Sequence, residues 1–154
     1  MNDKSKYTQF QMATASTLKA ISGETSNERE VKFSGTTSLL SSKEIRLPQI
    51  IKNLDQETLS TIRGESDKIA LKIKYHDPLL HSKIAPSSDL SSQIFQIAED
   101  ARVEALGTKN LIGLKNNLKI LLYNKFKDTI LPIPGSDNKE ALVNALHLVI
   151  REKI

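Results

Sequence analysis

The sequence predicts a mainly α-helical domain with one short β-hairpin near its N-terminus. In several long segments, apolar residues recur every three or four positions, which is the periodicity of one face of an α-helix. Glycine, proline, serine and aspartate stand at the ends of these segments, where helices commonly begin and end. Two short runs instead alternate polar and apolar residues, as β-strands do.

The first predicted helix covers residues 10–21. Its apolar residues lie roughly on one side, and Gly23 is a residue type that commonly closes a helix. The preceding residues 1–9 are polar. We therefore expect a flexible N-terminus over residues 1–9, followed by a single helical domain over residues 10–154.

The two alternating runs are residues 29–34 (REVKFS) and 43–47 (KEIRL). Apolar side chains share one face in each run, and Pro48 ends the second run. The simplest arrangement pairs the two runs as a small hairpin, joined by the loop at residues 35–42.

A long helix is predicted to begin after Asp55, which can cap its N-terminus. Gly64 inside this helix costs about 1 kcal/mol relative to alanine, so we expect a close helix contact or a kink there. Arg63 and Asp67 lie four positions apart and can form an ion pair on one face of the helix.

This helix is predicted to end at Tyr75 or His76. Asp77 can cap a new, short helix, and Pro78 is a favoured first residue of a helix. Pro86 ends that short helix, because the residue before a proline disfavours helical geometry.

The segment that we predict to organise the chain is residues 94–118. It contains an amphipathic helix, Gly107 as a left-handed residue that ends this helix, and then a second helix. We expect Leu90–Leu106 and Leu111–Phe126 to pack as an antiparallel pair at the centre of the fold.

A compact charged cluster lies on the first of these two helices, which Ser87 or Ser88 is expected to cap. The members of the cluster are Glu99, Asp100, Arg102 and Glu104. Charge near a core is either paired internally or functional. For Arg102, the two interpretations are an ion pair with Glu99 and a contact with a partner.

The C-terminal part is predicted to contain a rigid connector at residues 131–135 (LPIPG) and a final helix opened by a capping box at Asp137–Glu140. The side chains expected to face inward are Leu142, Ala145, Leu146 and Val149. The apolar stripe continues to the last residue. We therefore expect the chain to be either a truncated part of a longer protein or the product of an eroded gene.

The net charge of +4 is carried by the C-terminal third. Residues 1–101 hold 13 Lys and Arg against 13 Asp and Glu, whereas residues 102–154 hold 9 against 5. Five lysines lie in or next to the predicted helix Leu111–Phe126, namely Lys109, Lys115, Lys119, Lys125 and Lys127. We interpret them as a solvated face, with an acidic protein or a nucleic acid as the alternative partner. Arginines are not interleaved with aromatic residues as in a base-stacking platform.

Several classes of function find no support in the residues. The N-terminus lacks a signal peptide, and no apolar run is long enough to span a membrane. Cysteine is absent, which excludes disulfides and thiolate chemistry and fits a reducing cytoplasm. The motifs of phosphate loops, dinucleotide sites, zinc proteases and serine hydrolases are also missing, so we expect no ATP binding by this chain itself.

One constellation has the residue types of a metal site. His76 and His81, with Glu104 from a later helix, could bind a transition metal. However, the two histidines are five positions apart across a predicted helix break, so they need not share a face. Asp77 already has a structural role as a helix cap. We therefore favour packing and capping roles for these residues over a metal site.

A longer, collinear series of residues identifies a family. Its central members are Arg63-Gly64-Glu65, Asp67, Ala70, Leu71, His76-Asp77, Leu80-His81, Ala85-Pro86 and Glu99 to Gly107 (EDARVEALG). Its flanking members are Leu18-Lys19-Ala20-Ile21, Gly23, Glu30-Val31, Phe33, Arg46-Leu47-Pro48, Gly113 and Asn117. The series resembles the N-terminal region of the T subunit of the aerobic, ATP-dependent cobaltochelatase of cobalamin biosynthesis, the CobT family. The resemblance covers essentially the whole chain.

The resemblance implies a subunit of a ligase-class metal chelatase. In that family a large subunit binds the corrin hydrogenobyrinic acid a,c-diamide and inserts cobalt(II), and a second subunit is an AAA+ ATPase ring. The T subunit is implied to be a non-catalytic adaptor that couples ATP hydrolysis to remodelling of the large subunit. Its C-terminal von Willebrand A-type domain, which follows an acidic linker, is absent from this chain.

These implications fix the remaining expectations. The complex would use ATP, Mg²⁺ and Co²⁺, whereas this chain would bind no cofactor and carry no catalytic residue. We expect a cytoplasmic protein whose partners are the ATPase and the corrin-binding subunit, with no membrane or nucleic-acid partner. The residues expected to carry the family motif or to contact a partner are Arg63, Asp67, His76, Asp77, His81, Glu99, Arg102 and Glu104.

Two rival functions stay open at this point. The first is an adaptor of another AAA+ ATPase, of the MoxR type, that matures a different metalloenzyme. The second is a degenerate or active metallohydrolase-like domain that uses His76, His81 and Glu104. An ATPase gene next to a corrin pathway would favour cobaltochelatase, and a reductase operon would favour the other adaptor.

Overall fold

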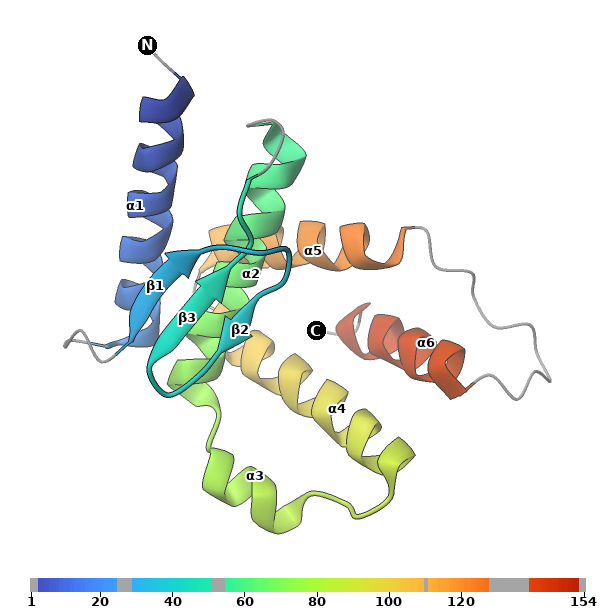
Figure 1. Cartoon of the computed structure of the whole chain (residues 1–154). Coiled ribbons are helices and arrows are strands. Elements are labelled where there is room, and N and C mark those ends of the chain that lie inside the picture. Colours follow the sequence, from blue (N-terminus) through green and yellow to red (C-terminus); the bar gives the residue numbers. More distant parts are fainter. Residues whose placement is uncertain (1–2, 25–28, 51–54, 110, 128–138, 153–154) are drawn as a thin grey trace.

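The computed structural model describes residues 3–24, 29–50, 55–109, 111–127 and 139–152. Within these residues the chain forms six α-helices and three β-strands, which confirms the predicted mainly α class (Figure 1). The elements in chain order are α1 (Asp3–Ser22), β1 (Glu30–Phe33), β2 (Leu39–Leu40), β3 (Glu44–Leu47), α2 (Gln56–Tyr75), α3 (Pro78–Ile84), α4 (Asp89–Thr108), α5 (Ile112–Phe126) and α6 (Lys139–Glu152).

Helix α1 begins at Asp3, so most of the N-terminal stretch that we expected to be flexible is helical. Half-buried Tyr7 lies three positions before buried Phe10, which extends the inward face of the helix toward the N-terminus. The predicted end is confirmed, because Gly23 has a φ of 77° and donates its N–H to the carbonyl oxygen of Lys19 at 3.1 Å.

The sheet corrects the predicted hairpin. Strand β3 lies in the middle, parallel to β1 on one side and antiparallel to β2 on the other. Gly35, with a φ of 70°, turns the chain after β1, and the two-residue strand β2 then pairs with β3. The central position of β3 explains why Ile45 and Leu47 are both fully buried.

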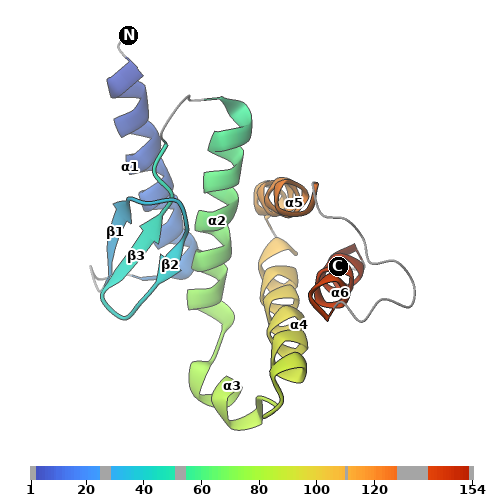
Figure 2. The ribbon, with the colours of Figure 1, turned by 45° about the vertical axis from the view of Figure 1, so that its right-hand side comes forward.

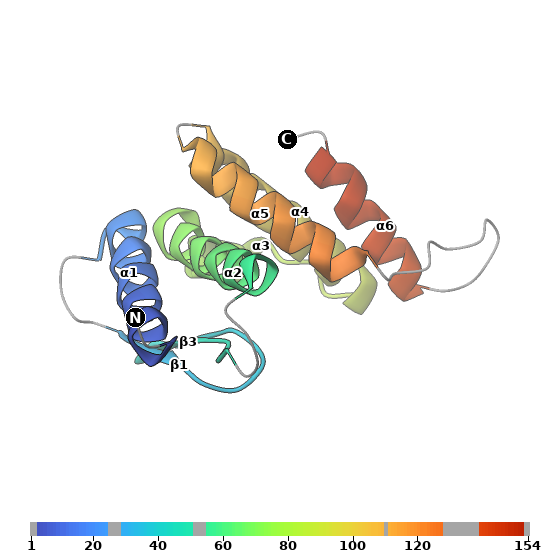
Figure 3. The same cartoon turned by 90° about the horizontal axis from the view of Figure 1, so that it is seen from above.

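Helix α2 is the central element of the fold. Figure 3 shows α1 and the sheet on one side of α2 and helices α4, α5 and α6 on the other. The core is divided in the same way. One cluster of buried residues comprises Leu18, Ile45, Leu47, Ile69 and Ala70, and the other comprises Leu71, Val103, Leu114 and Leu118.

The prediction of a central α4–α5 pair is therefore wrong. Helix α5 packs chiefly on α2, and α4 lies between α2 and α6 (Figure 2). Gly64 permits the close approach of α5, because a Cβ atom there would lie 2.8 Å from both the carbonyl oxygen of Asn117 and the Cβ atom of Leu121. The predicted close helix contact at Gly64 is confirmed.

Gly107 does not end α4, which continues to Thr108. Instead it is buried inside the helix against α2, and a Cβ atom at this position would overlap the side chain of buried Leu71. The glycine is thus required for close packing of two helices and not for a left-handed backbone.

Three predicted helix caps are confirmed. Asp55 Oδ1 accepts a hydrogen bond from the backbone N–H of Thr58 at 2.7 Å, and Asp77 and Ser88 cap α3 and α4 in the same manner. These caps fix where the three helices begin, and Asp77 sets the sharp turn between α2 and α3.

Helix α6 turns a different face inward from the one predicted. Ala141, Val143 and His147 are buried, whereas Leu142 and Val149 are about half exposed. The predicted connector at residues 131–135 and the capping residue Asp137 lie outside the described residues. No helix in the described part of the chain is both long and apolar enough to cross a membrane.

Candidate interaction site at the corner of α2, α3 and α4

The corner forms where α2 stops and α3 turns away from it. His76 leaves helical geometry with φ −94° and ψ 128°, and the carboxylate of Asp77 then accepts hydrogen bonds from the N–H groups of Leu79 and Leu80, both at 2.9 Å. Pro78 occupies the first turn of α3, where its missing N–H has no cost. A local sequence signal therefore determines the direction of α3.

Glu99 of α4 connects α4 to the end of α2. Its carboxylate lies 2.8 Å from His76 Nδ1 and accepts two hydrogen bonds of 2.7 Å from the guanidinium of Arg102. Arg102 also donates to the carbonyl oxygen of Tyr75 at 2.9 Å, which is one of the carbonyl groups that the end of α2 leaves without a helical partner. The predicted pairing of Arg102 with Glu99 is confirmed.

The electrostatics of Glu99 follow from these contacts. The hydrogen bonds from Arg102 lower the pKa of Glu99 to about 2, and the contact with His76 adds to this effect against the opposing influence of burial. Glu99 is thus held as a carboxylate under all ordinary conditions. In this role it joins α4 to the end of α2 through His76, which is 23 positions away in the chain.

The two histidines come together, contrary to what their spacing suggested. The turn at Asp77 brings the ring of His81 to 4.9 Å from that of His76, and the ring of Phe95 lies 4.8 Å from His81 on the other side. The Nδ1 atom of His81 is buried and has no hydrogen-bond partner among the described residues.

Glu104, the third residue of the candidate metal set, belongs to a different cavity. It is buried and lines a space of about 340 Å³ together with Lys68, Lys125 and His147. Within the described part of the chain, no group of three or more His, Asp or Glu side chains is arranged to hold a metal ion.

The remaining motif residues lie on the other side of α2. Arg63 and Asp67 were expected to pair, but the guanidinium of Arg63 lies 5.2 Å above the ring of Phe10. Asp67 instead accepts a hydrogen bond of 2.7 Å from Asn117 Nδ2. Burial raises the pKa of Asp67 to about 6, against the lowering effects of Asn117 and of the charge of Arg63.

Sequence reasoning missed two titratable residues, Lys68 of α2 and His147 of α6. Lys68 forms an ion pair of 2.8 Å with Asp100, and this lysine with Gln96 lowers the pKa of Asp100 although burial acts in the opposite direction. His147 was also missed. Burial and the nearby lysines Lys125 and Lys68 lower its pKa to about 4. Its place in the middle of the apolar stripe of α6 was the available signal.

Helix α3 presents apolar side chains to solvent. Leu79 is 74% exposed, Leu80 is 54% exposed and Ile84 is 59% exposed, and none of the seven residues of α3 is buried. A groove of about 590 Å³ runs between α3 and α4, with Phe95 on its wall and Arg102 at its edge. The helix is held at a defined angle by Asp77 and yet leaves its apolar surface unused.

The fold is that of a mainly α-helical domain with a small three-stranded sheet near its N-terminus. The family model described as cobalamin biosynthesis protein CobT matches residues 4–154, which is nearly the whole chain. The chain therefore belongs to the CobT family, and the resemblance inferred from the sequence is confirmed. Membership of this family supports involvement in cobalamin biosynthesis. No solved structure matches the chain.

Proposed function

We propose that this chain is the N-terminal module of the non-catalytic adaptor subunit of an ATP-dependent aerobic cobaltochelatase. In this role it supports the insertion of cobalt(II) into hydrogenobyrinic acid a,c-diamide by the corrin-binding subunit. Family membership over residues 4–154 supports the pathway. The arrangement of the corner supports a binding role within it.

The observation that carries the proposal is how the charged motif residues are used. His76, Glu99 and Arg102 bind to one another and to the end of α2, so their polar groups join α4 to α2 beside the point where α3 begins. Next to these paired charges, three large apolar side chains on α3 are exposed. Complete burial of such a side chain in a partner contributes roughly 1.5–3 kcal/mol, so this small surface can contribute substantially to association.

The proposed partners are the AAA+ ATPase ring and the large corrin-binding subunit. ATP and Mg²⁺ belong to the ATPase in this scheme, and Co²⁺ is the substrate of the large subunit. The sequence of this chain has no phosphate loop, in keeping with such a division of tasks. An adaptor of another MoxR-type ATPase would use the same surface, and the identity of the ATPase that binds distinguishes the two.

The proposal is tested by reconstitution with the purified ATPase and corrin-binding subunits. The wild-type chain is expected to co-elute with at least one of them in size-exclusion chromatography and to be required for ATP-dependent cobalt insertion. Leu79→Glu on α3 should weaken binding by about tenfold or more, because it places a charge in an apolar contact. Met12→Glu is the matched control, since Met12 is 65% exposed and belongs to α1, which lies on the other side of α2 from α4 (Figure 3).

Two results would contradict the proposal. One is cobalt insertion at the full rate in the absence of this chain. The other is cobalt insertion by the purified chain without either partner, which would make it the catalyst. Selective binding to the ATPase of a reductase or oxidase maturation system, and not to the cobaltochelatase subunits, would favour the rival adaptor.

A further inference from the structure

Helix α5 has a second apolar stripe that its packing does not use. The inward face contains Leu114 and Leu118, which are buried against α2. On the opposite face Ile112 is 78% exposed, Tyr123 is 67% exposed and Ile120 is 36% exposed. Positions 112, 116, 120 and 123 follow one another at intervals of three or four, so they form one continuous line along the helix.

The charged residues of α5 itself are all lysines. The chain has no Asp or Glu between Ala105 and Lys127, although it has five lysines there. Lys115 and Lys119 border the stripe and are exposed. Neither forms an ion pair with any of the residues that the structure describes. Their charges are therefore available to a partner.

The outward stripe is also held rigidly. Gly64 lets α5 approach α2 closely, and the hydrogen bond from Asn117 to Asp67 fixes the rotation of α5 about its axis. The stripe from Ile112 to Tyr123 spans twelve residues, and its ends are about 16 Å apart along the helix axis at a rise of 1.5 Å per residue. This length matches about three turns of a helix laid against it.

We propose that the outer face of α5, defined by Ile112, Lys115, Asn116, Lys119, Ile120 and Tyr123, binds an acidic, amphipathic helix of a partner protein. The inference rests on the proposed adaptor function and deepens it by naming the chemistry of one partner. Apolar side chains of the partner would cover Ile112, Ile120 and Tyr123, and its flanking Asp or Glu residues would pair with Lys115 and Lys119.

The chemistry of this face favours a protein over the other acidic partners. A nucleic-acid surface normally contains arginines that fork onto phosphates and aromatic residues on which bases stack, whereas this face has no arginine and a single tyrosine. A membrane-bound helix buries a broad apolar sector, whereas Asn116 and Lys119 interrupt the apolar line of α5. A protein helix can match such a mixed pattern residue by residue.

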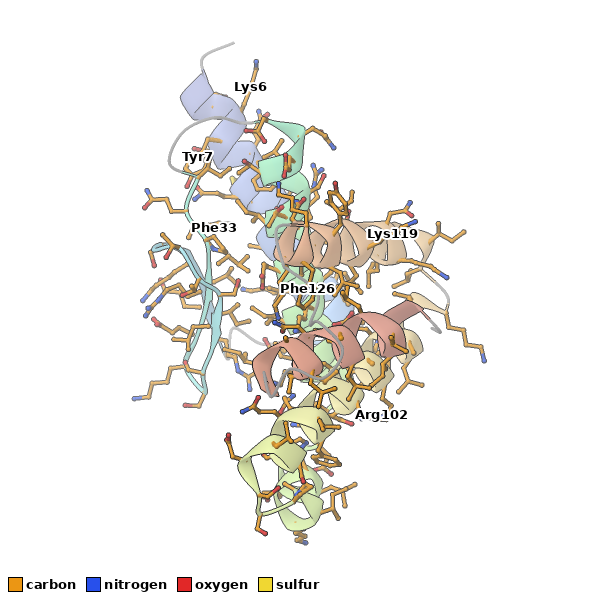
Figure 4. The ribbon with its side chains drawn as sticks, turned by 90° about the vertical axis from the view of Figure 1, so that its right-hand side faces the viewer. Lys6, Tyr7, Phe33, Arg102, Lys119 and Phe126 are labelled. Atoms are coloured by element: carbon orange, nitrogen blue, oxygen red, sulfur yellow. The ribbon has the colours of Figure 1, made fainter. Side chains whose placement is uncertain are left out.

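An adaptor needs two separate surfaces if it is to hold two partners at once. The corner of α3 and the outer face of α5 satisfy this requirement, since α3 lies at the lower end of the molecule and α5 lies higher up, above α4 (Figures 1 and 2). Arg102 at the corner and Lys119 on α5 are well separated in Figure 4. The two surfaces also differ in charge, because Asp77 and Lys83 give α3 both signs.

The test compares two double variants that change the formal charge equally. Ile112→Glu/Lys119→Glu alters the proposed face, and Met12→Glu/Lys43→Glu alters an exposed apolar residue and an exposed lysine elsewhere. Binding of each variant to the purified ATPase subunit and to the purified corrin-binding subunit is measured by biolayer interferometry at low and moderate salt. Circular dichroism checks that both variants are folded, and Lys115→Gln/Lys119→Gln serves as a milder second variant.

We expect the α5 variant to bind one of the two subunits at least tenfold more weakly, with a shallower salt dependence, and the control to bind like the wild type. Equal binding by all variants would overturn the inference and leave the adaptor proposal standing. A wild-type chain that binds neither subunit would refute both. If the α5 variant binds both subunits like the wild type but loses binding to phosphatidylserine vesicles or to a short DNA duplex, then the partner of this face is a membrane or a nucleic acid and not a protein helix.

Discussion

Asn117 of α5 donates a hydrogen bond of 2.7 Å to Asp67 of α2, a carboxylate that is only 3% exposed. The two residues are 50 positions apart, and their contact joins the two helices that pack most extensively. Burial of the carboxylate has a cost, because its ionised form loses hydration that one amide group replaces only in part. This cost makes stability depend on pH.

The first prediction is that Asp67 destabilises the fold as pH rises from about 4 to 6. The pKa of Asp67 is about 6 in the folded chain and has its ordinary value of 3.8 in the unfolded chain. The folded state therefore binds the proton more tightly, and the stability that this proton contributes is lost as pH rises through 6. At 1.36 kcal/mol per pKa unit, the difference corresponds to about 3 kcal/mol. Asp67→Asn should therefore be more stable than the wild type at pH 7.5 and gain much less at pH 4.

Urea unfolding at both pH values measures this effect. Asn117→Ala is the informative companion, because it leaves the carboxylate without its amide partner and should be less stable than the wild type at pH 7.5. Parallel pH profiles of wild type and Asp67→Asn would show that Asp67 is not responsible.

The second prediction concerns the opposite pH dependence of Glu99. Its pKa is lowered to about 2, so its contacts with Arg102 and His76 contribute stability above its ordinary pKa of 4.5 and lose it as pH falls toward 2. Glu99→Gln should cost roughly 1–3 kcal/mol at pH 7, the usual range for hydrogen bonds to charged groups. The difference from the wild type should shrink between pH 4.5 and 2.5 in chemical unfolding. A constant difference across that range would contradict the assigned contacts.

The third prediction separates two glycines of the same family series. Gly107→Ala introduces a Cβ atom that overlaps Leu71, so it should destabilise by about 1–3 kcal/mol, as overpacking does in cores. Gly113→Ala meets nothing within 4 Å and should be neutral or stabilise by up to about 1 kcal/mol, because alanine favours the helix. Thermal melts of the two variants suffice, and destabilisation by Gly113→Ala alone would reverse the assignment.

The contrast between glycines also shows what a sequence can predict about this fold. Gly23 was correctly assigned as a helix end, since a polar stretch follows it and the helical stripe stops there. Gly107 has similar local surroundings, but its role depends on Leu71, which is 36 positions away. Caps such as Asp55 and Asp77 were predictable because their hydrogen bonds are local.

Pairings between distant segments were the part that sequence reasoning could not reach. Strand β2 has only two residues, Leu39 and Leu40, which is too short to show any alternation, and without it the parallel order of β1 and β3 could not be inferred. At the site, three of the residues named from the sequence, His76, Glu99 and Arg102, meet at the corner, and their role in partner binding stays a prediction. The pairings of Lys68 with Asp100 and of Asn117 with Asp67 were missed, because only the packing of the helices brings these residues together.

The last prediction concerns metal binding at the corner, where the adaptor and metallohydrolase interpretations differ most. The rings of His76 and His81 lie 4.9 Å apart, yet Glu99 occupies His76 Nδ1 and Glu104 faces another cavity. We therefore expect neither Zn²⁺ nor Co²⁺ to raise the melting temperature. A ligand present at 100 times its dissociation constant and bound only to the folded state would add about 2.7 kcal/mol, which a thermal melt detects easily. His81→Ala should lose only its ring contacts with His76 and Phe95, whereas a saturable, one-to-one metal shift abolished by His76→Ala together with His81→Ala would favour the metallohydrolase.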